Sequence, residues 1–297
     1  MHPVKNTSAI HTLSFAFALA LALAIALAPA GPARAAGDPP AKDKAGASVE
    51  ESHGGWFSSW WPFGNGHFGL TVGGVTVMDG GTRIEGSDHL VHVPRAISGV
   101  HALELRAPVD VVIKQADVEK LTLHTDDNIA PLIETRVQDG VLHVTIQPGV
   151  SFHTGHAIGL TLEVPRLDAI RVVGSGDVVC AGLTTDLMEI TVRGSGDVRL
   201  DALHAGAVAV LIQGSGDVNL SGTAARQGYV IEGSGDISAQ ELTGKDVAVR
   251  IAGSGDASVW ATETLSVEIA GSGDVTYHGQ PTVKKAIHGS GDLIHGH

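Results

Sequence analysis

The tetrapeptide Gly174-Ser175-Gly176-Asp177 decides the fold, because the same four residues recur along the rest of the chain. Six further copies follow, each 18 to 20 residues after the one before. A short motif that returns at so constant a period is typical of a solenoid, in which each repeat forms one unit stacked on the next. The later copies begin at Gly194, Gly214, Gly233, Gly253, Gly271 and Gly289.

The residues before each motif alternate in character. The residue two positions before it is always β-branched, whereas the residue directly before it varies and includes Arg193, Gln213 and Glu232. This period of two indicates strands with one buried face, and the apolar stretches are too short for helices. We therefore predict an all-β fold, a parallel β-solenoid (β-helix) with rungs of 18–20 residues, right-handed as parallel crossovers usually are. The β-branched positions are Val172, Val192, Ile212, Ile231, Ile251, Ile269 and Ile287.

The motif itself suits a tight corner between two strands. Glycine permits a positive φ or a close approach of stacked backbones, and Ser and Asp side chains accept hydrogen bonds from nearby backbone N–H groups. Stacking brings the aspartates into a ladder with steps of ~4.8 Å, where like charges repel unless backbone donors or cations compensate. We favour corner capping over a calcium-binding ladder, and the residues of this alternative metal site are Asp177, Asp197, Asp217, Asp236, Asp256, Asp274 and Asp292.

The N-terminal segment has the pattern of a secretory signal peptide. Lys5 precedes an apolar run over residues 13–28, and Ala33-Arg34-Ala35 supplies the small residues that signal peptidase recognises. The run is shorter than the ~20 residues that cross a bilayer. We expect cleavage after Ala35 or Ala36, so that no membrane span remains; an uncleaved anchor is the alternative.

Three segments are expected along the chain. Residues 1–35 form the signal peptide, residues 36–70 a linker rich in Gly, Pro and Ala, and residues 71–297 the β-solenoid. Within the solenoid, residues 71–170 lack the tetrapeptide but alternate like strands. We therefore expect irregular rungs there, followed by regular rungs over residues 171–297.

An aromatic segment from Trp56 to Phe68 ends the linker. Three tryptophans lie within its first six residues. Such a segment can be an interfacial anchor or a stacking platform for sugar rings. We favour a plug that covers one end of the core, because repeat folds need covered ends.

Composition narrows the classes of partner and site. The formal charge of −13 disfavours binding to nucleic acid or to an anionic membrane surface, because both need a basic face. The single cysteine, Cys180, excludes an intrachain disulfide. It occupies the same place in its repeat as Leu200 and Leu220, which indicates a buried core thiol rather than a reactive one.

The sequence contains no motif of a known catalytic site. A nucleophile elbow, a phosphate-binding loop and a zinc-protease helix are all missing, and we nominate no catalytic residue, cofactor-binding residue or cofactor. Asp126 and Asp127 follow His124 but are interpreted as a turn before Asn128. Histidines crowd the C-terminus, and we interpret them as exposed side chains rather than a loose transition-metal site: His278, His288, His295 and His297.

The repeat series from Gly174 to Asp292 resembles that of a family of bacterial envelope proteins, the GIN-type "putative autotransporter adhesin head" domain. The resemblance covers about residues 95–294 and implies a right-handed β-helical fold in an exported protein. The family's name implies adhesion, although its members generally have no assigned activity. The other stretches that carry the resemblance are residues 97–115, 126–128, 137–142 and 271–281.

These observations favour a non-enzymatic, exported structural or binding module of the cell envelope, periplasmic or secreted, whose partner is an envelope protein or a glycan. The alternatives are a carbohydrate-active enzyme on the same scaffold and a calcium-binding solenoid. A smooth outer face of Thr, Ser and Ala would favour the binding module. A grooved face with several converging charged side chains would favour the enzyme.

Overall fold

The computed structural model describes residues 69–72, 75–78 and 82–296. The regular elements in these residues are strands, apart from one short 3-10 helix, η1 (Ala130–Leu132). No helix in the described part of the chain is long and apolar enough to span a membrane. The all-β prediction is confirmed. The predicted signal peptide, the aromatic segment and nearly all of the predicted linker lie outside the described residues.

The chain divides into two compact units. In one of them, β1 (Gly69–Val72) and β2 (Val75–Met78) form an antiparallel hairpin. The domain boundary predicted after residue 70 therefore falls inside β1. The other unit contains the strands from β3 onwards, and all further description concerns it.

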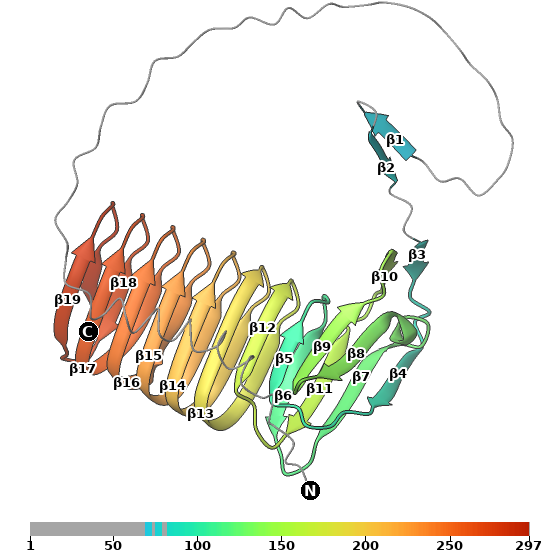
Figure 1. The fold of residues 1–297 in the computed structure, drawn as a ribbon, viewed down its shortest axis with the longest axis horizontal. Coiled ribbons are helices and arrows are strands. Elements are labelled where there is room, and N and C mark those ends of the chain that lie inside the picture. The colour runs from blue at the N-terminus through green and yellow to red at the C-terminus, as the bar shows by residue number, and fades with distance from the viewer. Residues whose placement is uncertain (1–68, 73–74, 79–81, 297) are drawn as a thin grey trace, which may run out of the picture. The chain divides into compact units, whose positions relative to one another are not determined.

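The repeat region is a parallel β-solenoid of about six turns (Figure 1). Consecutive strands from β12 to β17 pair in parallel, each displaced by one repeat along the chain. The predicted solenoid is thus confirmed. Its strands are β12 (Ala169–Gly174), β13 (Val178–Gly194), β14 (Val198–Ile212), β15 (Val218–Ile231), β16 (Ile237–Ile251), β17 (Ala257–Ile269), β18 (Val275–His278), β19 (Thr282–Ile287) and β20 (Leu293–His295).

Each long strand bends and contributes to two layers. The first part of β13 pairs with β6 through Val178–Cys180, whereas its last part pairs with β12 through Glu189–Gly194. At the C-terminal end the two parts of β17 pair with separate strands, β18 and β19. We call the outer surface of the first parts, which includes Ser258, face A. The outer surface of the last parts, which includes Ser266, is face B.

The core lies between the two layers, and the predicted register is confirmed. Ile212 is 0% exposed and Val210 is 3% exposed, whereas Gln213 and Arg193 are exposed. Cys180 is 1% exposed and stacks in register with Leu200, as its place in the repeat predicts. Stacked β-branched and aliphatic side chains therefore form one continuous core along the solenoid.

The strands before the repeats do not form a simple succession of parallel rungs. Strands β5, β6 and β9 extend the parallel layers, but β4–β7, β7–β11 and β8–β9 are antiparallel pairs. One cause is local: Asp139 and Gly140, which join β8 to β9, have φ values of 51° and 78°, as a two-residue hairpin turn requires. The strands are β3 (Thr82–Glu85), β4 (Leu90–Arg95), β5 (Ala102–Leu105), β6 (Asp110–Gln115), β7 (Lys120–Asp126), β8 (Ile133–Gln138), β9 (Val141–Ile146), β10 (Val150–His153) and β11 (Gly159–Val164).

Candidate functional site

The aspartates of the tetrapeptide form a hydrogen-bonded ladder between rungs. Oδ1 of Asp177 accepts the backbone N–H of Asp197 at 2.8 Å, and the same bond joins every later pair of neighbouring motifs at 2.7–2.8 Å. A longer contact of 3.4 Å links the N–H of Asp177 to Asp110, which lies before the first motif. Each corner carboxylate from Asp177 to Asp274 therefore accepts a backbone N–H from the following rung.

The second glycine of each motif allows this stacking. These glycines are buried, and a Cβ on Gly216 would lie 2.1 Å from the carbonyl oxygen of Gly196. The same clash repeats at the later corners, whereas a strongly positive φ occurs within the motifs only at Gly174 and Gly194. Close approach of backbones, rather than left-handed geometry, is thus the general reason for glycine at these corners.

The ladder geometry favours capping over calcium binding. One oxygen of each carboxylate before Asp292 accepts a backbone N–H, and this bond compensates part of the negative charge, as the capping prediction requires. Within residues 82–296 no group of three or more His, Cys, Asp or Glu side chains is placed to hold a metal ion. Corner capping by the aspartates therefore remains our prediction.

Face A carries a continuous row of small polar side chains. Asn219 pairs in register with Ser238, Ser238 with Ser258, and Ser258 with Thr276. All four are partly exposed, and the residues on either side of each are buried in the core, except that Tyr277 beside Thr276 is only partly buried. Valines and Arg199 continue the row toward β6. Strands β15 to β18 thus present one stripe of hydroxyl and amide groups.

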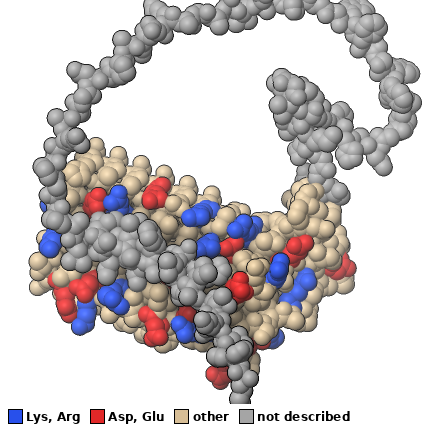
Figure 2. All heavy atoms as spheres, viewed as in Figure 1, with Lys and Arg blue, Asp and Glu red and all other residues tan. Residues whose placement is uncertain are grey.

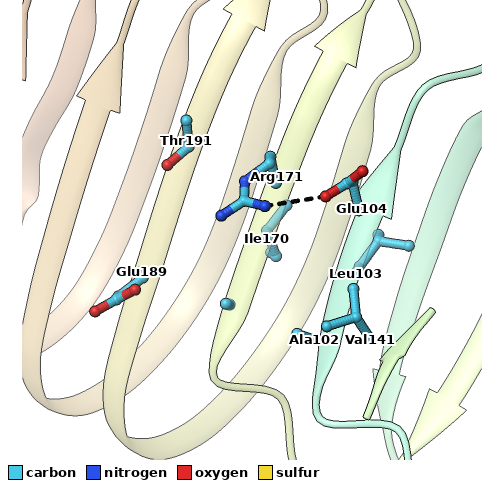
Figure 3. A pocket seen from close by; sticks show the side chains of 9 residues that line it. Ala102, Leu103, Glu104, Val141, Ile170, Arg171, Glu189 and Thr191 are labelled. Carbon is cyan, nitrogen blue, oxygen red and sulfur yellow. Dashed lines mark hydrogen bonds and ion pairs between the residues drawn. The ribbon is translucent and has the colours of Figure 1, made fainter. Parts of the chain in front are cut away.

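Face B contains a hollow lined by side chains from β5, β9, β12 and β13. Figure 3 shows Arg171 reaching across from β12 toward Glu104 on β5, with Glu189 and Thr191 on the next strand. Farther along the face, Gln213 accepts a hydrogen bond from Nε of Arg193 at 2.7 Å. On the side of the molecule shown in Figure 2, acidic and basic side chains are interspersed rather than separated by sign.

Glu104 is the centre of the charged group at the hollow. Its side chain is 6% exposed, and its two oxygens accept bonds from Arg106 at 2.5 Å and from Arg171 at 3.0 Å. Nδ1 of His143 lies 3.5 Å from the first oxygen. Desolvation by burial raises the pKa of Glu104, but the hydrogen bonds and charges of the two arginines outweigh it, so that the net pKa is lowered.

The predicted turn at Asp126 exists, and the aspartate is buried, which the sequence does not indicate. The N–H of Ile129 donates to the carbonyl oxygen of Asp126 at 3.0 Å and closes the turn. The carboxylate is 0% exposed; it accepts the hydroxyl of Thr154 at 2.6 Å and lies 3.4 Å from Nδ1 of His156. A Cβ at Gly86 would meet the same carboxylate at 2.1 Å, so glycine at residue 86 leaves room for it.

The C-terminal histidines do not gather into a site within the described residues. The ring of His278 stacks on Trp260 with centroids 5.8 Å apart, and His295 stacks on Tyr277 at 4.8 Å. Burial raises the pKa of the Cys180 thiol to about 11, as expected of a core cysteine. No catalytic residue was nominated from the sequence, and the polar groups that the fold assembles come from strands distant along the chain.

Comparisons with known proteins agree with the fold. The family "Putative auto-transporter adhesin, head GIN domain" matches residues 100–281. The structure is similar to that of a putative adhesin from Bacteroides fragilis, with 28% sequence identity and a TM-score of 0.69 over 71% of this chain and 99% of the other. No curated protein matches the chain.

Two structures from Parabacteroides share the fold at lower identity. A putative lipid binding protein from Parabacteroides distasonis has 24% identity and a TM-score of 0.63, and covers 73% of this chain and 100% of its own. A putative adhesin from Parabacteroides merdae has 21% identity and a TM-score of 0.58, over 72% of this chain and 99% of its own. The family match spans more than half of the sequence, so the chain belongs to the head GIN domain family of putative autotransporter adhesins.

Proposed function

We propose that the chain is an exported, non-enzymatic binding module of the cell envelope, which holds a protein or glycan partner on face A. The observation that carries the proposal is the in-register row of Asn219, Ser238, Ser258 and Thr276. Neighbouring rungs lie ~4.8 Å apart, so the row offers hydrogen-bonding groups at a regular spacing. Such a surface binds through many shallow contacts rather than through one deep pocket.

The hollow on face B brings charged side chains together, a feature that favours a carbohydrate-active enzyme, but only one of the two carboxyl groups in its lining is available for acid–base chemistry. That group is Glu189, whose pKa burial raises to about 7. Glycoside hydrolysis uses a pair of carboxyl groups, one free to donate a proton and the other free to act as base or nucleophile. Both oxygens of Glu104 instead accept hydrogen bonds from Arg106 and Arg171. Glu104 is therefore held in ion pairs with these two arginines in the hollow on face B.

Family membership and the N-terminal sequence support the proposed export of the protein. The family is one of putative adhesins, and the similar protein from Bacteroides fragilis is a putative adhesin as well. The apolar run over residues 13–28, followed by Ala33-Arg34-Ala35, supports export through a signal peptide. The proposed site of action is the periplasm or the medium.

A matched pair of substitutions on one strand tests the proposal. Ser258 and Ser266 are both partly exposed serines of β17, but they lie on faces A and B, respectively. The mature protein is applied to envelope extracts and to a glycan array, and the partner captured is then titrated against the variants. We expect Ser258→Arg to weaken binding at least tenfold and Ser266→Arg to leave it unchanged. Loss of binding in Ser266→Arg alone, or turnover of a captured glycan, would contradict the proposal.

A further inference from the structure

Two histidines meet on face A, near the N-terminal end of the solenoid unit. His92 on β4 lies directly opposite His124 on β7 in the antiparallel register. Their ring centroids are 4.6 Å apart, the ring planes are inclined by 74°, and the two Nδ1 atoms are in contact. Two nitrogen lone pairs repel each other at contact. One nitrogen must therefore carry a proton, or the two must share a cation.

A threonine on the next strand fixes the orientation of one ring. Oγ1 of Thr161 on β11 lies 3.1 Å from Nε2 of His124 and can accept its N–H. With Nε2 protonated, a neutral His124 directs the lone pair of Nδ1 toward His92. Metal-binding histidines are held in the same way, because their second ring nitrogen donates to a neighbouring oxygen.

We propose that His92 and His124 form a two-imidazole site for a divalent late transition-metal ion, which each ring binds through Nδ1. Imidazole nitrogen suits Cu²⁺, Zn²⁺ and Ni²⁺, whereas Ca²⁺ and Mg²⁺ prefer oxygen. Bonds of ~2.0–2.1 Å to one ion place the two nitrogens roughly 3 Å apart. The His92 side chain is exposed, which leaves its ring room to rotate toward that separation.

The surroundings make this an exchangeable site. Among the described strands β4 pairs with β7 alone, so His92 lies on an edge that solvent reaches. No set of three or more His, Cys, Asp or Glu side chains in residues 82–296 is placed to hold an ion, so water completes the coordination shell here. Structural zinc sites use four protein ligands, whereas sites with fewer keep positions open. The ion is therefore expected to exchange with solution.

Titration of the mature chain with Cu²⁺ tests the site, in protein purified without a polyhistidine tag. Calorimetry counts the equivalents bound, and electron paramagnetic resonance detects nitrogen donors. We expect the wild type to bind one equivalent more than His92→Gln or His124→Gln. His204→Gln is the matched control, because the exposed His204 also contacts a threonine, Thr223 at 3.0 Å, but faces no histidine across the strands. This control should keep the equivalent.

The outcome separates a metal site from a hydrogen-bonded pair. If the wild type and His92→Gln bind the same number of Cu²⁺ ions with the same affinities, the proposal is overturned. The same holds if His204→Gln loses as much binding as the two variants. Thr161→Val provides a second readout: loss of the orienting oxygen should weaken Cu²⁺ binding by about 10- to 100-fold. Circular dichroism confirms that each variant is folded.

Discussion

The backbone N–H of Asp217 donates to Oδ1 of Asp197 at 2.8 Å, and the carboxylate of Asp217 accepts the N–H of Asp236 at 2.8 Å. Each corner aspartate between the first and the last motif is thus both a donor to the rung before it and an acceptor from the rung after it. The repeat of this bond along the solenoid gives Asp a role that Ser or Gly in the same corner does not fill. The ladder joins neighbouring rungs through side chains in addition to the backbone bonds of the two layers.

Two substitutions of Asp217 distinguish the contribution of its acceptor oxygen to stability from the contribution of its negative charge. Asp217→Ala leaves the N–H of Asp236 without its acceptor and should lower the free energy of unfolding by about 1 kcal/mol. Asp217→Asn keeps an acceptor oxygen and removes one charge from the stack, so its effect should be close to zero. Urea unfolding of both variants provides the measurement. Equal losses in Asp217→Ala and Asp217→Asn would show that the charge, rather than the acceptor, matters.

A methyl group at a corner glycine should force two rungs apart. In Gly216→Ala the new Cβ lies 2.1 Å from the carbonyl oxygen of Gly196, which is backbone and cannot rotate away. We expect a loss of about 3 kcal/mol in the free energy of unfolding. Gly155→Ala is the control, because its Cβ would lie 3.8 Å from the exposed side chain of Asp88, at ordinary contact distance. Equal melting temperatures for the two variants would contradict the stacking described above.

The inward register can be tested with one charge placed on either side of a strand. Ile212→Asp puts a carboxylate into a core position that is 0% exposed and should cost about 4 kcal/mol or more, enough to unfold the repeats. Gln213→Asp places the same side chain on the exposed neighbour and should be nearly neutral. Both are compared by thermal melting. A soluble Ile212→Asp variant with an unchanged melting temperature would rule out this register.

Glu104 should contribute to the loss of unfolding free energy as the pH falls. The pKa of this carboxyl is lowered in the folded protein relative to the ordinary value of 4.5. Its ion pairs with Arg106 and Arg171 therefore stabilise the fold fully above that value, and the contribution is lost as the pH falls through the lowered pKa. The difference in unfolding free energy between wild type and Glu104→Gln should thus be constant near pH 7 and shrink below about pH 4. A difference that grows toward acid pH would reverse the assignment.

Export should be visible at the N-terminus of the purified protein. If residues 1–35 are a signal peptide, mass spectrometry of the exported protein should find Ala36 or Gly37 as the first residue. Fractionation should place that protein in the periplasm or the medium. Intact Met1–Ala35 on membrane-bound protein would establish the anchor instead.

The regular rungs could be predicted from sequence because the pattern is displayed seven times. The alternation around Ile212 and Gln213 fixes which side chains face the core, and the constant spacing of the tetrapeptides fixes the register between rungs. The place of Cys180 follows from the same alignment of repeats. In this part of the chain, the local residue pattern therefore specifies both the buried face and the stacking of the rungs.

The strands before the repeats, over residues 82–168, and their polar groups could not be predicted in the same way. Glu104 meets Arg171 from 67 residues away, and Asp126 meets Thr154 from 28 residues away. These contacts depend on which strands pair and in which direction, and alternation of apolar residues does not encode either. The antiparallel pair of His92 and His124 is a further case, because nothing in the sequence around each histidine points to the other.

A thermal melt of the mature protein in millimolar calcium and in chelator tests the central claim, that the corner aspartates hold neighbouring rungs together without a bound ion. The bonds from Asp217 to Asp197 and from Asp236 to Asp217 satisfy one oxygen of each carboxylate internally, so calcium should leave the melting temperature nearly unchanged. Calcium bound only by the folded state would instead stabilise it by ~2.7 kcal/mol per site at a hundredfold excess over the dissociation constant. A large calcium-dependent rise in melting temperature, weakened in Asp217→Asn, would contradict the account.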